Sequence, residues 1–588
     1  MRTALIGLVL SVAATAWGDD WTTFYEKSGH EKTPDYETTV AYCKRLAAAS
    51  PWVHYTTFGT SPQGRDLSLV IVDRKGRFGA DEVRQSDNVV FLIQAGIHAG
   101  EIDGKDAGMM LIRDIAIEKE LSSLLDHVTI LFMPIFNVDG HERFGPYNRA
   151  NQNGPAEMGW RTTAANLNLN RDYLKADAPE MQAWLKLYTE WLPEFLADSH
   201  VTDGADYQYV VTYALETGGN MDAELTAWTN DRYLPPLERA MDESSIPIMR
   251  YASYRTRHEP KTGIVKWASP PRLSTGYAAL QNRPALLIET HMLKDYESRV
   301  TGTYEILRHT LEILNQEHDT LRRLVREADE RSASSEFRET EFPLAFESNG
   351  DSVMIDYLGY EYEVVDSDLT GGKWHRFSDR PATFRIPYFN ELKPKTTAAL
   401  PRAYIIPVEW TDVIERLGLH GISMVRLEQN WTLPVRTYKL TDPKWARSPY
   451  EDRFRVEYEM TPVTEVRTYH AGSVVVDMNQ RTSRVAAHLL EPAGADSFVR
   501  WGFFNAVFER KEYVESYVIE ALARRMLEQD EALRQEFEEA KAKDAEFAES
   551  PYRIRMWFYE RTPYWDDRIG IYPVGMITDD KLLDHLPK

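Results

Sequence analysis

Apolar residues in the first half of the chain form short continuous runs, separated by stretches in which they recur with helical spacing. The separating stretches predict helices around 104–120, 178–192, 222–243 and 301–329. Continuous apolar strands that alternate with helices are typical of an α/β domain whose sheet is buried on both faces. We therefore predict an α/β domain with a mixed, largely buried sheet flanked by helices over about residues 35–310. The runs that predict its strands are LSLVIVD (67–73), VVFLIQAG (89–96), VTILFMPIFN (128–137), FLADSH (195–200), YQYVVTYAL (207–215) and PALLIETHML (284–293).

The pattern changes after the polar stretch READERSASSEF at 326–337, which predicts a domain boundary. Short strand-like segments with frequent turn residues dominate from there to about 480, which indicates a β-rich accessory domain over 338–490. A C-terminal region, 491–588, carries a heavily charged helical pattern at 512–548. Its first half has an apolar stripe and its second half is mostly charged, so we expect a long helix that projects from the body. The domain that precedes the boundary is assigned to 19–330.

The N-terminus predicts a signal peptide over residues 1–18. Arg2 precedes the apolar run ALIGLVLSVAA, and Ala14-Thr15-Ala16 fits a small-x-small cleavage site. A buried N-terminal helix is the alternative. No later segment reaches the roughly 18 apolar residues of a membrane-spanning helix, so we expect no membrane insertion after cleavage. The chain is then periplasmic or secreted.

Composition excludes several classes of partner and site. The 588 residues carry a formal net charge of −23, which argues against nucleic acid or an anionic membrane as the main partner. The only cysteine, Cys43, excludes an intramolecular disulfide and a Cys-rich zinc site. The sequence does not determine the oligomeric state.

Candidate chemistry begins with His98 and Glu101, in the loop that follows the strand at 89–93. An imidazole and a carboxylate are ligands suited to Zn²⁺, and a catalytic zinc needs one further protein ligand and a water. The spacing alone is weak, because His309 with Glu312 and His488 with Glu491 repeat it. A third ligand must therefore come from another strand.

That ligand is predicted to be His200, at the carboxyl end of FLADSH, where open α/β sheets usually place ligand sites. A single His at a strand end is more often structural. Because His98 and Glu101 also lie at a strand end, we expect His200 to be a metal ligand. Glu289 lies inside the apolar run ALLIE, where a carboxylate is costly to bury without a charge partner or a chemical task. It is the candidate general base, and a salt-bridged structural Glu is the alternative. His291 receives no role.

These residues resemble the M14 zinc carboxypeptidase family, in which HxxE, an Asn-x-Asp-Gly turn, an Asn-Arg pair, a ligand His and a catalytic Glu follow in order. The resemblance covers about residues 35–310. It is carried by His98-Ala99-Gly100-Glu101, Asn137-Val138-Asp139-Gly140, Trp160-Arg161, Asn170-Arg171, His200 and Glu289.

The resemblance implies a single Zn²⁺ held by His98, Glu101 and His200. It implies that Arg161 polarises the substrate carbonyl and that Asn170 and Arg171 bind the free C-terminal carboxylate of a peptide. Asp172, next to Arg171, is a competing partner for that arginine.

The chain departs from the family in two places. Some members carry an arginine between the HxxE ligands, where this chain has Gly100, so that contact is lost. The tyrosine that covers the substrate has no clear counterpart: Tyr277 is the candidate, with Tyr251 and Tyr254 as alternatives.

The leading hypothesis is an exported zinc metallocarboxypeptidase that hydrolyses C-terminal peptide bonds, with a metal-activated water and Glu289 as general base. One alternative is a zinc amidase that acts on cell-wall peptides or acylated amino acids. Another is an inactive exported binding protein. The side-chain preference is left open.

Overall fold

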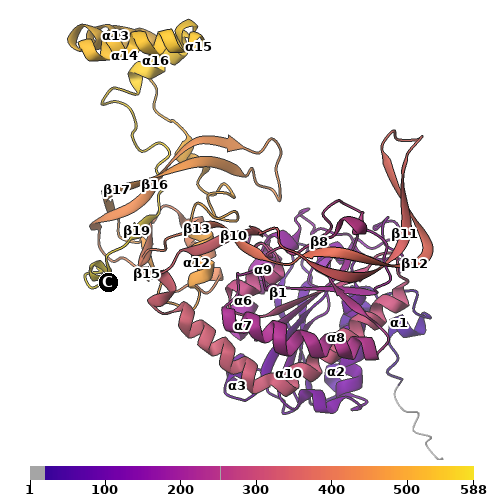
Figure 1. Cartoon of the computed structure of the whole chain (residues 1–588). Coiled ribbons are helices and arrows are strands. Elements are labelled where there is room, and N and C mark those ends of the chain that lie inside the picture. The colour runs from indigo at the N-terminus through magenta and orange to yellow at the C-terminus, as the bar shows by residue number, and fades with distance from the viewer. Residues whose placement is uncertain (1–19, 252, 588) are drawn as a thin grey trace, which may run out of the picture.

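The computed structural model describes residues 20–251 and 253–587 (Figure 1). The predicted signal peptide lies outside these residues. No helix within the described residues is long and apolar enough to cross a bilayer.

The N-terminal half is built on an eight-stranded mixed sheet in the order β1-β2-β4-β3-β5-β9-β6-β7. The central strands β4, β3, β5 and β9 are parallel, while β1, β2 and β6 add antiparallel neighbours. All six predicted strands are present, and the prediction of a mixed, buried α/β sheet is confirmed. The bounds are β1 Val53–Thr60, β2 Asp66–Val72, β3 Val89–Gln94, β4 Val128–Met133, β5 Phe195–Thr202, β6 Val211–Leu215, β7 Ile248–Arg250 and β9 Ala285–His291.

Helices cover both faces of this sheet. One face packs against α2 (Tyr36–Ala49), α4 (Asp103–Ala116), α7 (Ala223–Trp228), α8 (Leu234–Glu243) and α10 (Tyr296–Ser332). The other packs against α6 (Pro179–Trp191) and α9 (Ser274–Leu280). Short helices complete the domain: α1 Phe24–Lys27, α3 Ala80–Arg84 and α5 Val138–Glu142. The sheet is buried on both sides because its strands are apolar at nearly every position.

The accessory region packs against the face of the sheet that α6 and α9 cover, and its apolar residues continue the same hydrophobic core. Apolar residues of α11 (Thr411–Leu419) and α12 (Ser483–Leu490) belong to the same buried cluster as those of α6 and α9. The hairpin of β11 (Val353–Asp366) and β12 (Lys373–Phe389) extends the short strand β8 (Ile264–Val265), and β10 (Phe342–Ser348) pairs with β13 (Leu392–Ala398). The accessory region therefore shares a core with the α/β domain.

A six-stranded sheet in the accessory region has the order β15-β18-β14-β19-β16-β17. Its last strand in the chain, β19, lies between β14 and β16 and pairs with both. Residues on both sides of the predicted boundary at 490 therefore form one sheet. The bounds are β14 Ala403–Ile406, β15 Val425–Arg426, β16 Trp431–Trp445, β17 Val456–Tyr469, β18 Val474–Asp477 and β19 Gly575–Ile577, and α17 (Asp580–Leu583) follows.

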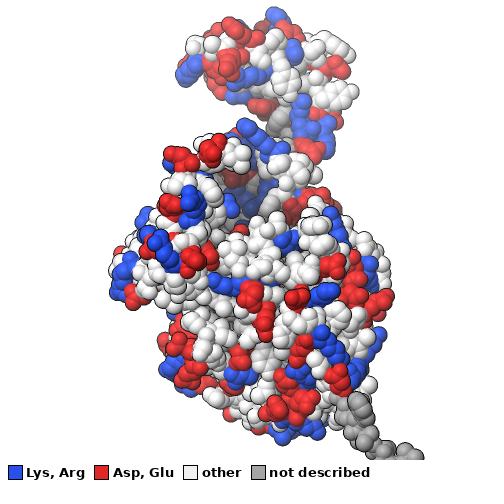
Figure 2. Space-filling model, turned by 90° about the vertical axis from the view of Figure 1, so that its right-hand side faces the viewer, with Lys and Arg blue, Asp and Glu red and all other residues white. Residues whose placement is uncertain are grey.

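The predicted long helix at 512–548 is wrong, because the segment is divided into short helices. They are α13 (Ser516–Gln529), α14 (Glu531–Lys543) and α15 (Ala545–Glu549), and α16 (Pro551–Tyr559) follows the segment. Asp530, Asp544 and Ser550 each accept a backbone N–H of the helix that follows, so each begins a new helix. The four helices form a bundle with its own small core, which stands apart from the body (Figures 1 and 2). Acidic and basic side chains are interspersed over the face in Figure 2.

Candidate metal centre

The site lies where β3, β5 and β9 run side by side in parallel. Their carboxyl ends share one edge of the sheet, which is where open α/β sheets bind ligands. The loop after β3 turns at Gly96, with φ +67°, and carries His98 and Glu101 to this edge. His200 is on β5, directly opposite Glu289 on β9. Strand pairing thus brings together side chains that are distant in the sequence.

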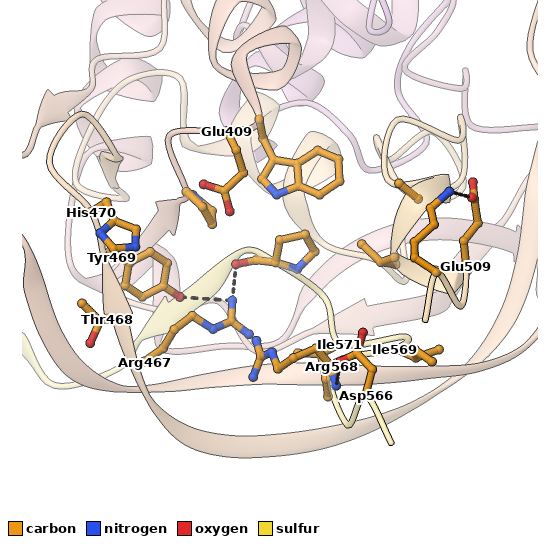
Figure 3. Close-up of a pocket in the computed structure, with 16 residues that line it drawn as sticks. Glu409, Arg467, Thr468, Tyr469, His470, Glu509, Asp566, Arg568, Ile569 and Ile571 are labelled. Atoms are coloured by element: carbon orange, nitrogen blue, oxygen red, sulfur yellow. Dashed lines mark hydrogen bonds and ion pairs between the residues drawn. The ribbon is translucent and has the colours of Figure 1, made fainter. Parts of the chain in front are cut away.

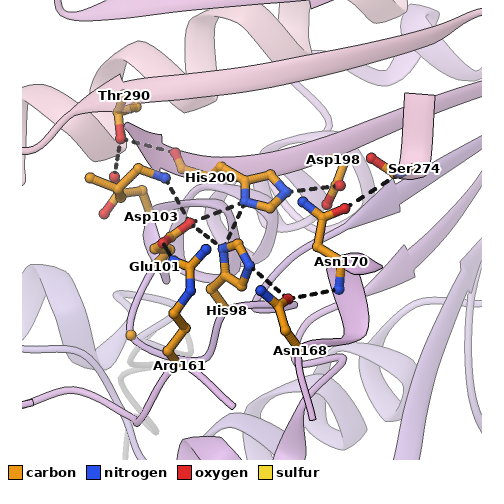
Figure 4. A network of polar contacts seen from close by, with 12 residues as sticks. His98, Glu101, Asp103, Arg161, Asn168, Asn170, Asp198, His200, Ser274 and Thr290 are labelled. Atoms are coloured by element: carbon orange, nitrogen blue, oxygen red, sulfur yellow. Dashed lines mark hydrogen bonds and ion pairs between the residues drawn. The ribbon is translucent and has the colours of Figure 1, made fainter. Parts of the chain in front are cut away.

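Three ligand atoms converge at this edge, as Figure 4 shows. His98 Nδ1 lies 3.0 Å from Glu101 Oε2, and His200 Nδ1 lies 3.1 Å from the same oxygen. The two Nδ1 atoms are 3.2 Å apart. All three residues are at most 4% exposed. A tetrahedral ion with bonds of 2.0–2.1 Å needs donors separated by about 3.3 Å, close to the spacing found here.

The hydrogen bond made by Nε2 of each imidazole determines which tautomer is present, and so which ring nitrogen has a free lone pair. His200 Nε2 donates to Asp198 Oδ2 at 2.9 Å, and His98 Nε2 donates to Asn168 Oδ1 at 3.1 Å. Both Nδ1 lone pairs therefore point toward the Glu101 carboxylate. Three acceptors that face one another repel unless a cation lies among them, so the donor set fits Zn²⁺.

Burial keeps His98 in the form that a metal requires, because it lowers the pKa of that imidazole to about 4. Burial alone would raise the pKa of Glu101, but the neighbouring His98 and Arg149 lower it well below its usual range. A neutral imidazole and an ionised carboxylate are the protonation states of zinc ligands.

Another His-carboxylate group in the described residues, formed by Asp87, His127 and His318, lies nearer the surface. Its two imidazole rings stack at 3.8 Å with an interplanar angle of 9°. Lone pairs of parallel rings do not converge on one point, so this group lacks the geometry of the first. The two spacing look-alikes are structural as well. His309 bonds to Glu312 and Ser244, whereas His488 is buried and Glu491 bonds to Tyr404.

A cavity of about 580 Å³ opens over the three ligand atoms. Glu289, Arg161, Asn170 and Arg171 line it together with the ligands. A smaller cavity of about 350 Å³ lies in the accessory region (Figure 3). The guanidinium of Arg467 in that cavity is bonded to Glu465 and to backbone carbonyls, so it has a structural use.

Glu289 has the environment of a proton acceptor. Burial raises the pKa of its carboxyl to about 8, and the nearby Glu101 and Asp198 carboxylates add to the rise. A carboxyl whose pKa lies near neutrality can both accept and return a proton.

Two arginines share the second oxygen of Glu101. Arg149 Nη2 lies 2.7 Å and Arg161 Nη1 lies 3.1 Å from Oε1. Both arginines line the cavity, but the Arg149 side chain is 14% exposed and that of Arg161 is 42% exposed, so Arg161 is the more accessible of the two. The sequence analysis did not single out Arg149.

Gly100 makes room for Arg149. A Cβ at position 100 would lie 2.9 Å from Arg149 Cγ and 2.7 Å from the carbonyl oxygen of Gly159. A side chain there would displace Arg149 from Glu101. Some M14 members carry an arginine at the position of Gly100. In this chain the side chain of Arg149 occupies the space beside Gly100 instead.

Arg171 is not paired with its neighbour Asp172. The Asp172 carboxylate is buried and bonds to Lys175, at 2.5 Å, and to the backbone N–H groups of Asp177 and Ala178. Arg171 Nη1 donates to the carbonyl of Asn170 at 2.6 Å, and both residues line the cavity.

The prediction for Tyr277 as a substrate-binding residue is wrong. Its side chain is fully buried on α9, and its hydroxyl bonds to His420 and Gln281 at 2.9 Å. It faces away from the cavity because α9 packs this side chain against α6. The hydroxyl of Tyr254 bonds to Tyr357, which leaves Tyr251 as the tyrosine that lines the cavity.

The chain is similar to several known proteins. Residues 39–203 match the sequence model of the family described as zinc carboxypeptidase, Peptidase_M14. Carboxypeptidase 2 of Trichophyton rubrum is 21% identical over 485 residues, which cover 79% of this chain and 83% of the relative. A probable carboxypeptidase 2 of Arthroderma benhamiae is 20% identical over 474 residues, covering 77% and 83%. A crystal structure of a putative carboxypeptidase A from Shewanella denitrificans shares 19% identity and covers 48% of this chain and 69% of its own, with a TM-score of 0.37.

Proposed function

We propose that this chain, a metallocarboxypeptidase of the zinc carboxypeptidase family, is exported and removes C-terminal residues from peptides with one bound Zn²⁺. The observation that supports it most is the convergence of His98, Glu101 and His200 beneath a cavity that Glu289 and Arg171 also line. Export rests on the N-terminal sequence.

His98, Glu101 and His200 would hold the ion, whose chemistry is to activate water and to polarise a carbonyl. Glu289 accepts a proton from the attacking water on its carboxylate and returns it to the leaving amine. Arg161 turns from Glu101 Oε1 toward the substrate and donates to the developing oxyanion. Arg149 remains on that oxygen and keeps Glu101 in place.

Arg171 and Asn170 select the end of the peptide. A guanidinium offers paired donors that match a carboxylate, and the buried Lys175 already neutralises Asp172. The Arg171 donors in the cavity are therefore available to a free C-terminal carboxylate. This contact is what makes the proposed enzyme an exopeptidase.

The test compares one peptide with a free and with an amidated C-terminus, with zinc content measured on the same sample. We expect release of the last residue from the free acid only. The Arg171→Ala variant should retain zinc and lose the preference. Equal cleavage of both peptides by the wild type would contradict the carboxylate contact, and release of products from muropeptides alone would favour an amidase.

A further inference from the structure

The tip of the accessory hairpin β16–β17, residues 446–455, reaches the α/β domain beside the metal centre. The hairpin itself belongs to the six-stranded sheet (Figure 1). Its tip contacts the segment 168–177, which carries Asn168, Asn170 and Arg171. A loop that is remote in the sequence is thus part of the wall behind the site.

One contact links this tip to a metal ligand through a single residue. Glu451 Oε2 accepts the backbone N–H of Asn168 at 2.8 Å. The side-chain Oδ1 of Asn168 then accepts from His98 Nε2 at 3.1 Å and from the backbone N–H of Asn170 at 3.0 Å. Figure 4 shows the second half of this chain of bonds. Asn168 is 8% exposed, so its N–H would have few other partners.

Neighbouring contacts hold the tip on the α/β domain. Arg453 donates to both carboxylate oxygens of Asp177, each at 2.7 Å, and Arg416 reaches the same carboxylate at 3.1 Å. Outside the α/β domain, Tyr450 stacks on Trp501 of the C-terminal region with ring centroids 5.9 Å apart. The tip therefore has a fixed position relative to Asn168.

The backbone at the contact is a tight turn, closed by two hydrogen bonds between the backbones of Tyr450 and Arg453. Glu451 has φ +52° and Asp452 has φ +62°, both in the left-handed region. A two-residue hairpin turn of type I′ requires positive φ at both central residues, so the conformation follows from the turn. The turn places Glu451 against Asn168 and Arg453 against Asp177.

We propose that Glu451 is a positioning residue of the metal centre. By fixing Asn168, it holds the imidazole of His98 with Nδ1 directed at the ion. The accessory region then has a defined task, which is to complete the support of a metal ligand that the α/β domain supplies. This inference rests on the proposed zinc function.

The test compares Glu451→Gln with Glu451→Met in the full-length chain. Both variants keep the length of the side chain, but only the amide keeps an oxygen that can accept from Asn168. Zinc affinity is measured by competition with a chelator, and exchange of the Asn168 amide hydrogen is followed by mass spectrometry. Glu459→Met, an exposed glutamate on β17, is the matched control. Thermal unfolding of each variant confirms that it folds.

We expect Glu451→Met to bind zinc about tenfold more weakly and to exchange the Asn168 amide faster, with Glu451→Gln and Glu459→Met close to the wild type. Zinc affinities that agree within about twofold in Glu451→Gln and Glu451→Met would overturn the inference and leave the function intact. A wild type that binds no zinc would instead contradict the proposed function. If Glu451→Met fails to fold, Glu451→Asp replaces it, because its carboxylate is one methylene too short to reach the Asn168 N–H. Faster exchange at Asn168 and weaker zinc binding in Glu451→Asp than in Glu451→Gln would support the inference, and equal values in the two variants would contradict it.

Discussion

The Nδ1 atoms of His98 and His200 lie 3.2 Å apart, although 102 residues separate them in the sequence. In the neutral tautomers that donate from Nε2 to Asn168 and Asp198, both Nδ1 atoms carry lone pairs. The two lone pairs therefore face one point together with the Glu101 carboxylate. This relationship is the physical basis of the predictions below.

His200→Ala should lose bound zinc. Two ligands remain, and Asp198 loses the imidazole to which it is bonded, so metal content should fall from one ion to near zero per protein. The control is His309→Ala, which removes another buried histidine that bonds to a carboxylate, Glu312 on α10. Metal analysis of both purified variants decides the point. Full zinc occupancy in His200→Ala would require another ligand.

Glu289→Gln should retain zinc and lose turnover. The amide is similar in shape to the carboxylate but cannot accept the proton of the attacking water. A positioned general base typically contributes about 10²–10⁴-fold in rate, so kcat should fall by that range. Rates and metal content are measured on the same preparation. An active Glu289→Gln enzyme would show that another group is the base.

Arg149 and Arg161 should separate into two roles. Arg149→Ala removes the less exposed partner of Glu101, so we expect zinc affinity to fall about 10–100-fold. Arg161→Ala should retain zinc and lose about 10²–10³-fold in kcat, because its donor acts on the oxyanion. Chelator competition and steady-state kinetics on both variants test this assignment. The reverse result, with zinc lost from Arg161→Ala alone, would exchange the two roles.

Low pH should weaken the ion pair between Asp177 and Arg453, which holds the hairpin tip on the α/β domain. Burial alone would raise the pKa of Asp177, but Arg453 and Lys175 lower it to about 2. A carboxyl with a depressed pKa contributes stability above its unfolded pKa of about 3.8, and this is lost as the pH falls through 2. The pH-dependent part amounts to about 2 kcal/mol.

The check is Asp177→Asn, which cannot ionise. Its deficit in unfolding free energy relative to the wild type should shrink by about 2 kcal/mol between pH 5 and pH 2. Denaturant unfolding at several pH values in this window measures the deficit. A deficit that is constant with pH would mean that Asp177 is not the titrating anchor.

Local sequence patterns predicted the catalytic half well. Apolar runs such as VVFLIQAG and FLADSH are strands because nearly every side chain in them is buried. Strand β1, with its mixed burial pattern, escaped prediction, since an edge strand lacks a continuous apolar signal. The prediction of a long helix at 512–548 was wrong because Asp530 and Asp544 each cap a new helix within that segment.

Side-chain direction was harder to predict than strand position. Tyr277 stands in a segment close to Glu289, yet α9 turns it into the core toward His420. Arg149 lies in a polar loop whose sequence gives no sign that it crosses Gly100 to reach Glu101. Both outcomes depend on packing between segments that are far apart.

The sequence by itself determined the residue types that can hold zinc, the strands that present them and the order in which they occur, because these follow from local apolar patterns and donor chemistry. Only the tertiary structure decided that Glu101 is shared by Arg149 and Arg161, and that Glu451 of a remote hairpin supports Asn168 behind His98. These contacts join segments that are far apart in the sequence. They form because the α/β domain and the accessory region share a hydrophobic core, and local sequence patterns do not show which distant segments that core brings together.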